Sequence, residues 1–253
     1  NKQCEITCPR CNKQNKTHPP TQKVEISGPE DIDAFGAHSI RCTAGGHAQR
    51  TKLWHDPLRD IWLKVFRHAG FTAVKEPTNV IRDSEKRPDV SVTLVDSLQL
   101  LHLDIRTCDP LTKQHVRKCS QKPGFAANAG AAEKDRAWLG FTAAQGDLFQ
   151  AICHEHPGRI GEGALAALER AAAQFAQSEA QRTAFRVYWL QRLHITNTRG
   201  VADLIFHQMP YCNGNDVVSP LALPNPFAAT LDMACPNPRA TGVQIDPTLD
   251  PSL

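Results

Sequence analysis

Two aspartates stand in segments that alternate between polar and apolar side chains. Asp89 begins the alternation in residues 88–95, and Asp104 lies in the second half of residues 98–107. This period of two predicts half-buried β-strands with one polar face, and it places both aspartates on that kind of face. Two carboxylates on neighbouring strands can share a divalent cation such as Mg²⁺ or Mn²⁺. A cation held there would activate water for the cleavage of a phosphodiester.

A cationic side chain follows the second aspartate. Arg106 lies two residues after Asp104, so on a strand both side chains point to the same face. A cation beside a scissile phosphate can orient the attacking water or offset developing charge. The same residues also fit an ion pair at a strand edge, and their spacing alone leaves both interpretations open.

The first 50 residues contain a second cluster of reactive side chains but little apolar material. A CxxC pair is followed by an HxxxC pair, with 26 residues between the second cysteine and the histidine. Four ligands of this kind suit tetrahedral Zn²⁺ in a closed, structural site, which would stabilise a segment that lacks a core. The predicted zinc ligands are Cys8, Cys11, His38 and Cys42. Cys4 and His47 are the substitutes, and free cysteines or a secreted disulfide framework are the alternatives.

Helical and strand patterns surround the two aspartates. Residues 51–70 show apolar side chains at helical spacing, with Asp56 as the expected N-cap and Gly70 as the expected C-cap. Strands are predicted over 71–75, 88–95, 98–107 and 148–153, with a turn at 96–97. A helix is predicted over 125–139, one or two long helices over 161–193, and a shorter one over 201–207. This order predicts an α/β domain with a mixed sheet.

Composition limits the class of protein. The chain has 253 residues, a formal net charge of +3 and 41% hydrophobic residues, which allows one ordinary domain with an appendage. The mild positive charge permits nucleic-acid binding without demanding it. No apolar run reaches the roughly 18 residues of a membrane span, so no membrane partner is expected. We predict a zinc-binding module over 1–50, a main domain over 51–208 and a Pro-rich, disordered tail over 209–253.

Several short motifs, taken in order, resemble one known family. They are Arg-Pro-Asp-Val at 87–90, Leu-Asp-Ile-Arg-Thr at 103–107, and Ala-Glu-Lys-Asp-Arg at 132–136, with the His-containing segment 33–42 before them. Together they are similar to the zinc segment and restriction-like endonuclease of non-LTR retrotransposons, over roughly residues 4–175. The resemblance implies a PD-(D/E)xK restriction-endonuclease-like core of helix, three strands, helix and strand. The predicted zinc module precedes this core, and helices follow it.

The resemblance also implies roles for individual residues. Asp89 and Asp104 would bind Mg²⁺ or Mn²⁺, with Glu76 as a third ligand or merely a loop carboxylate. The family usually has lysine where this chain has Arg106, and arginine cannot act as a base. In this retrotransposon branch the lysine is placed on the following helix, where Lys134 stands; a solvated, ion-paired helix residue is the other interpretation. His55 is either near the site or a structural histidine.

The implied activity is metal-dependent nicking of target DNA, whose new 3′ end primes reverse transcription. Expected partners are DNA, the RNA of the element and an upstream reverse transcriptase domain, and the expected location is the nucleus. Two alternatives stay open. One is a catalytically inactive, zinc-stabilised nucleic-acid-binding module derived from such an element. The other is a purely structural domain with no dependence on Mg²⁺.

Overall fold

A computed structural model describes residues 50–80, 85–156 and 158–208. These residues fall within Asn1–Pro210, one of the two units into which the chain divides. In chain order, the elements are the π-helical turn η1 (Thr51–His55), α4 (Asp56–His68), β1 (Thr72–Lys75), β2 (Val90–Thr93), β3 (Leu100–Cys108), α5 (Val116–Gln121), α6 (Phe125–Ala143), β4 (Leu148–Glu155), α7 (Glu162–Phe175) and α8 (Glu179–Gln208). The predicted zinc module and the predicted tail lie outside the described residues.

The four strands form one mixed sheet in the order β1-β2-β3-β4. The first three strands are antiparallel neighbours, with Val90 opposite Leu103. The last pair, β3 and β4, is parallel, and the chain between them forms α5 and α6. A parallel pair needs such a crossover connection, because a hairpin can join only antiparallel strands. The predicted α/β class with a mixed sheet is therefore confirmed.

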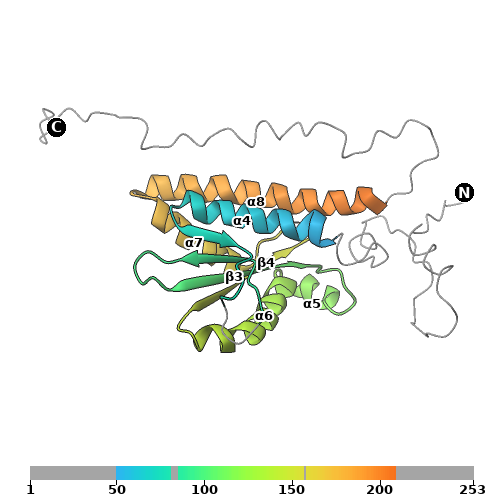
Figure 1. Ribbon diagram of the computed structural model, residues 1–253. Coiled ribbons are helices and arrows are strands. Elements are labelled where there is room, and N and C mark those ends of the chain that lie inside the picture. Colours follow the sequence, from blue (N-terminus) through green and yellow to red (C-terminus); the bar gives the residue numbers. More distant parts are fainter. Residues whose placement is uncertain (1–49, 81–84, 157, 209–253) are drawn as a thin grey trace, which may run out of the picture. The chain divides into compact units, whose positions relative to one another are not determined.

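Helices cover both faces of the sheet (Figure 1). The layer of α4, α7 and α8 lies on one face, and α5 and α6 lie on the other. The larger apolar core fills the first interface and includes Trp62 and Phe66 of α4, Leu103 and Ile105 of β3, and Leu193 of α8. A smaller cluster of alanines and cysteines lies under α6. In the described part of the chain, no helix is both long and apolar enough to cross a membrane.

The polar face of the strands is buried, which differs from the half-exposed sheet that the alternation predicts. Ser91 and His102 lie on neighbouring strands and are almost fully inaccessible. Their side chains satisfy each other, with Ser91 Oγ 2.7 Å from His102 Nδ1. The second ring nitrogen of His102 lies 3.3 Å from Asp147 Oδ2. Polar side chains in such surroundings need partners, and here the partners come from the sheet and the loop before β4.

The first helical segment begins at Thr51, as its predicted range does, and not at the capping signal of Asp56. Asp56 is not the N-cap, because the chain is already helical through the π-turn at Thr51–His55. Its carboxylate instead accepts a hydrogen bond from Arg59 at 2.8 Å. At the other end the helix stops at His68, and Gly70 takes the positive φ of 90° that suits the position after a C-cap.

The predicted separate helix over 201–207 is wrong, because α8 continues through that segment. Two residues that weaken a helix are used here for tertiary contacts. Asn197 accepts a hydrogen bond from Trp54 Nε1 at 2.6 Å and donates one to the carbonyl of Glu155 at 2.9 Å. A Cβ on Gly200 would come within 2.8 Å of the Trp54 ring, so only glycine allows the two helices to pack this closely.

Candidate active site

Asp104 lies in the middle of β3, and α6 supplies both of its closest partners. Lys134 Nζ donates to Asp104 Oδ2 at 2.7 Å, and Trp138 Nε1 donates to the same oxygen at 2.5 Å. Residues four apart share one face of a helix, so α6 presents the ammonium and the indole side by side. The side chain of Asp104 is only 9% exposed. A buried carboxylate of this kind is held by a charge and a hydrogen bond together.

Asp89 immediately precedes β2, and its carboxylate reaches across to β3. Its Oδ2 accepts a hydrogen bond from the backbone N–H of Ile105 at 2.6 Å. It also interacts electrostatically with the carboxyl group of Asp104. The two aspartates that the sequence places on one face are therefore neighbours in space. The antiparallel pairing of β2 with β3 produces this proximity.

The two carboxyl groups respond to this closeness in opposite ways. The pKa of Asp104 is raised to about 6, chiefly by burial; Lys134 opposes the shift and the nearby Asp89 adds to it. Burial acts in the same direction on Asp89, but its hydrogen bond with His55 and that from Ile105 lower its pKa overall. When the two groups titrate as a pair, Asp104 is the member that keeps its proton longer. A cation between them would remove their mutual repulsion.

His55 belongs to the same site, because η1 and α4 carry it to the edge of the strand pair. Its Nε2 lies 3.1 Å from the carbonyl oxygen of Ile105 and 3.3 Å from Asp89 Oδ2. Its Nδ1 lies 3.3 Å from Asp56 Oδ1. Burial alone would lower the pKa of His55, but Asp89 and Asp56 outweigh that effect and raise it. These contacts place His55 beside Asp89, as expected for a histidine near the site.

Arg106 and Glu76 have partners other than the two aspartates. Arg106 Nη1 lies 2.8 Å from Glu133 Oε2 on α6. Glu76 forms an ion pair with the buried guanidinium of Arg59 and a longer one, 3.7 Å, with Arg87. Its backbone N–H donates to the carbonyl of Asp89 at 2.9 Å, so Glu76 adjoins the site through its main chain.

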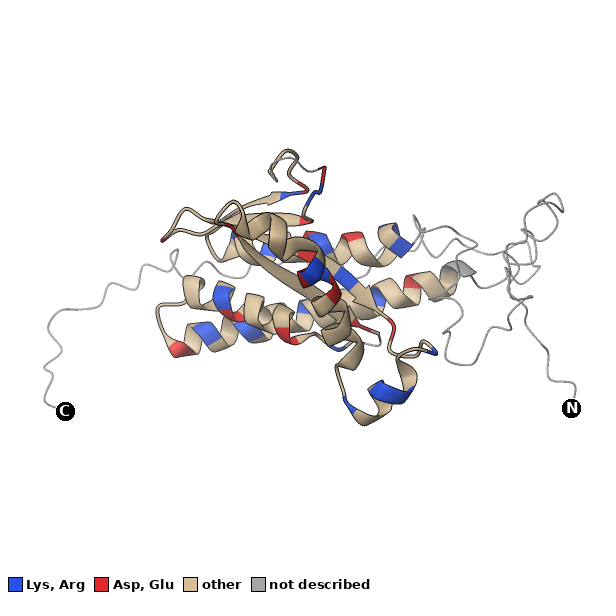
Figure 2. Cartoon of the chain, turned by 90° about the horizontal axis from the view of Figure 1, so that it is seen from below, with Lys and Arg blue, Asp and Glu red and all other residues tan. Residues whose placement is uncertain are grey.

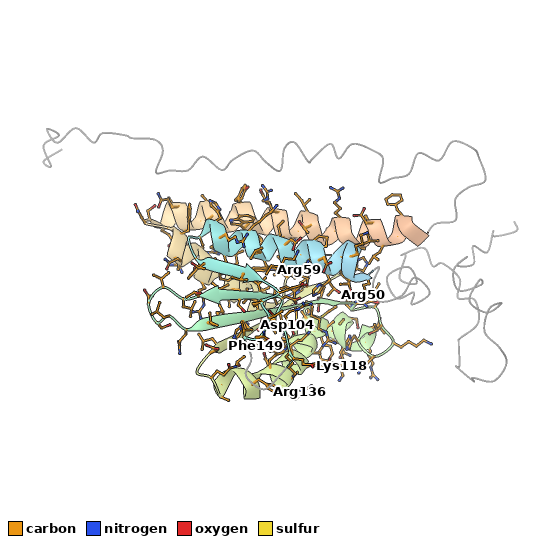
Figure 3. The ribbon with its side chains drawn as sticks, in the orientation of Figure 1. Arg50, Arg59, Asp104, Lys118, Arg136 and Phe149 are labelled. Atoms are coloured by element: carbon orange, nitrogen blue, oxygen red, sulfur yellow. The ribbon has the colours of Figure 1, made fainter. Side chains whose placement is uncertain are left out.

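A groove with a volume of about 750 Å³ opens over Asp104 between the sheet and α6. In Figure 3, Asp104 lies between the layer that holds Arg50 and Arg59 and the layer that holds Arg136. Basic residues dominate the ionisable groups that line the groove; they are Arg50, Lys86, Arg87, Arg106 and Lys134. The acidic residues in its lining are Asp104 and Glu133. Seen from the α6 side, basic and acidic segments of α6 lie over the middle of the sheet (Figure 2).

The donors in this groove and next to it are chemically suited to a hard divalent cation. Two carboxyl groups and the backbone carbonyl of Ile105 provide oxygen atoms, which are the ligands that Mg²⁺ and Mn²⁺ prefer. In the described ranges, no group of three or more His, Cys, Asp and Glu side chains is already arranged around a metal position. The predicted zinc ligands Cys8, Cys11, His38 and Cys42 lie outside those ranges.

Sequence reasoning did not identify Trp138 as a site residue. Its ring stacks on Phe149 with centroids 5.5 Å apart and an angle of 9°, which directs the indole N–H at Asp104. Lys86 lies 5.5 Å from the centre of the same ring. The available signal was the spacing of four between Lys134 and Trp138, which places both on one helical face.

No known protein family matches the chain, and no curated protein sequence is significantly similar to it.

Proposed function

We propose that this chain is a metal-dependent DNA endonuclease with a PD-(D/E)xK-like core. The observation that carries the proposal is the convergence of three side chains from three separate elements. Asp89 comes from the residue before β2, Asp104 from β3 and Lys134 from α6, and Lys134 Nζ lies 2.7 Å from the Asp104 carboxylate. The order of helix, three strands, helix and strand supports the same proposal.

Each residue has a distinct part in the proposed reaction. Asp89 and Asp104 hold the cation, which when bound would supply an acidified water and offset charge on the phosphate. Lys134 keeps a positive charge beside Asp104, where it can orient the water or stabilise the transition state. Water adds to phosphorus as the bond from phosphorus to the 3′ oxygen breaks. The attacking water loses a proton, the departing 3′ oxygen takes one up, and the phosphate stays on the 5′ end. The nick leaves a 3′ hydroxyl end.

The groove supports a nucleic acid as the substrate. Its basic side chains can contact phosphate oxygens, which sets the position of the backbone without reading the sequence. Arg106 contributes to this lining and is held by Glu133, so we assign it to backbone contact and not to the catalytic cation. Target-primed reverse transcription, with a zinc module and an upstream polymerase, is the context that the family resemblance adds to this proposal.

A catalytically inactive nucleic-acid-binding module is the second candidate. Two observations favour it. Arg106 stands where the resembled family usually has lysine, and no three acidic, histidine or cysteine side chains in the described ranges already surround a metal position. This candidate keeps the basic groove and predicts binding of DNA that does not depend on Mg²⁺.

The decisive experiment is nicking of supercoiled plasmid DNA by the full chain. Reactions contain Mg²⁺, Mn²⁺ or EDTA, and they compare the wild type with Asp104→Ala and with Asp96→Ala. Asp96 is an exposed aspartate in the β2–β3 loop and serves as the matched control. We expect metal-dependent nicking that Asp104→Ala reduces by roughly 100-fold or more and Asp96→Ala leaves intact. Absence of nicking, with retained DNA binding, would favour the inactive module.

A further inference from the structure

The ring of His55 faces oxygen atoms on both sides. Nε2 lies near the carbonyl oxygen of Ile105 and Asp89 Oδ2, at 3.1 Å and 3.3 Å, and Nδ1 lies 3.3 Å from Asp56 Oδ1. Carbonyl and carboxylate oxygens only accept hydrogen bonds, and a neutral imidazole carries one N–H and one lone pair. One of the two sides therefore presents a nitrogen lone pair to oxygen lone pairs when the ring is neutral.

The side that faces Asp56 is the better place for the proton. Asp56 is fixed in turn by Arg59, whose Nη1 donates to the same Oδ1 at 2.8 Å. Arg59 is only 5% exposed and is also paired with Asp60 and Glu76, so this charge cluster is rigidly held. A carboxylate on the outer nitrogen fixes the tautomer and orientation of a histidine that binds metal through its other nitrogen.

The opposite side then presents three converging donors of electron pairs. They are Nε2 of His55, Oδ2 of Asp89 and the carbonyl oxygen of Ile105, which come from η1, the residue before β2, and β3. When the ring is neutral with its proton on Nδ1 and no cation is present, these lone pairs repel one another. A divalent cation at their common centre would turn the same arrangement into ligation.

We propose that His55 is a nitrogen ligand of the divalent cation in this site, beside Asp89, the Ile105 carbonyl and Asp104. This inference rests on the proposed nuclease site and adds a property to it. Mg²⁺ strongly prefers oxygen ligands and octahedral geometry, whereas a transition metal accepts imidazole nitrogen more readily. The site is therefore expected to bind Mn²⁺ in preference to Mg²⁺, with Asp56 as the residue that positions the ring.

The test is pulsed electron paramagnetic resonance of Mn²⁺ bound to the full chain. Zn²⁺ is added first to fill the predicted cysteine site. Bound Mn²⁺ should show coupling to ¹⁴N, and growth on ¹⁵N-labelled histidine should replace it with ¹⁵N coupling. In His55→Gln the nitrogen coupling should disappear and the Mn²⁺ dissociation constant should rise by roughly tenfold or more. His194→Gln, which changes an exposed histidine of α8, should keep both.

The outcomes separate this inference from the proposed function. Bound Mn²⁺ without histidine nitrogen coupling in the wild type would overturn the ligand assignment, whether or not the protein nicks DNA. Persistence of the coupling in a folded His55→Gln variant would do the same. Histidine coupling in a protein that never nicks DNA would support the metal site and count against the endonuclease. If His55→Gln fails to fold, the isotope exchange in the wild type and the Asp56→Asn variant decide, because loss of the carboxylate should weaken Mn²⁺ binding.

Discussion

His154 and Asp104 are buried ionisable groups on adjacent strands, but they face opposite layers of the molecule. His154 of β4 points into the α4 and α8 layer, where it is fully buried and accepts a hydrogen bond from Trp62 Nε1 at 2.9 Å. Asp104 of β3 points toward α6, where a charged lysine and an indole meet it at the bottom of an open groove. Burial disfavours the charged form of both groups and shifts both pKa values accordingly.

The difference lies in what surrounds each group after burial. Burial lowers the pKa of His154 to about 3, with a smaller contribution from His194, and its closest polar partner is a neutral indole. It is suited to remaining neutral within the fold. Asp104 has a charged partner, a second acid within reach and access to solvent through the groove. A shifted pKa therefore marks a reactive site only when charges and access accompany it.

The largest expected effect concerns the charged partner of Asp104. Lys134→Ala should lower the nicking rate by roughly 100-fold or more, because it removes the positive charge beside the reacting phosphate. Arg106→Ala is the matched control, since it removes another cation from the same groove. It should cost less than about tenfold, because a phosphate contact serves binding more than the chemical step. Rates at saturating DNA measure the effect.

Equal losses in the two variants would show that the groove acts through its total positive charge. A small loss in Lys134→Ala with a large loss in Arg106→Ala would show that Arg106, at the family's usual position on the strand, is the catalytic cation. DNA affinity at two salt concentrations separates these cases, since loss of a phosphate contact reduces the salt dependence of binding.

The second prediction concerns His154, on the face of the sheet that packs against α4 and α8. The pKa of His154 is about 3 in the folded protein and 6.5 in its ordinary state, so the unfolded chain binds more protons between these values. Stability is therefore full above pH 6.5 and is lost as the pH falls toward 3. At pH 4.5 the loss from this residue amounts to about 3 kcal/mol at most. His154→Gln, which can still accept the Trp62 N–H, should remove that part of the acid sensitivity.

Urea denaturation of wild type and variant at pH 7.5 and 4.5 measures this effect. The variant should lose less stability than the wild type over that interval. Other histidines with lowered pKa values, such as His68 and His102, keep some slope in both proteins. Parallel pH dependence in the two proteins would show that His154 becomes charged without cost, and the contrast between the two faces would then fail.

The sequence predicts the face of the sheet that holds Asp104 better than the face that holds His154. Alternation placed Asp89 and Asp104 on one face, and the Ala-rich pattern predicted the helix that carries Lys134. Trp138 was missed because its role depends on the stacking with Phe149, a contact 11 residues away that no local pattern reports. Asp56 was misread as an N-cap, because helix propensity and cap preference could not show that the π-turn before it continues the helix.

Long-range contacts explain the remaining differences. Asn197 and Gly200 resemble a helix break in sequence, but in α8 they serve the packing against Trp54. His102 lies on a predicted solvent face and yet is fully buried, because α6 covers that face. The identity of the catalytic cation is still a prediction that the sequence suggested through resemblance. The structure brings Lys134 to Asp104, and activity measurements must decide its role.

The smallest expected effect has the opposite sign from that of His154. The pKa of Asp104 is about 6 in the folded protein against an ordinary value of 3.8, so the folded state binds more protons within this window. Stability then falls as the pH rises from 3.8 through 6, and the penalty is fully present above that range. Asp104→Asn should therefore be more stable than the wild type at pH 8, by about 1 kcal/mol, and by less at pH 4.5. The lowered pKa of Asp89 and the lost ion pair with Lys134 reduce the gain.

Urea denaturation in EDTA at pH 8 and 4.5 measures this gain, with Asp96→Asn as the control. If Asp104→Asn is destabilised equally at both pH values, the fold accommodates the charged form of Asp104 without cost. Asp104 would then be a structural group, like His154. Addition of Mn²⁺ sharpens the contrast, because a ligand that binds only the folded state stabilises it. Mn²⁺ should raise the stability of the wild type at pH 8 and have a much smaller effect on Asp104→Asn. His154→Gln should respond to Mn²⁺ like the wild type, since the His154 side chain is bonded to Trp62 and is not a ligand of the proposed site.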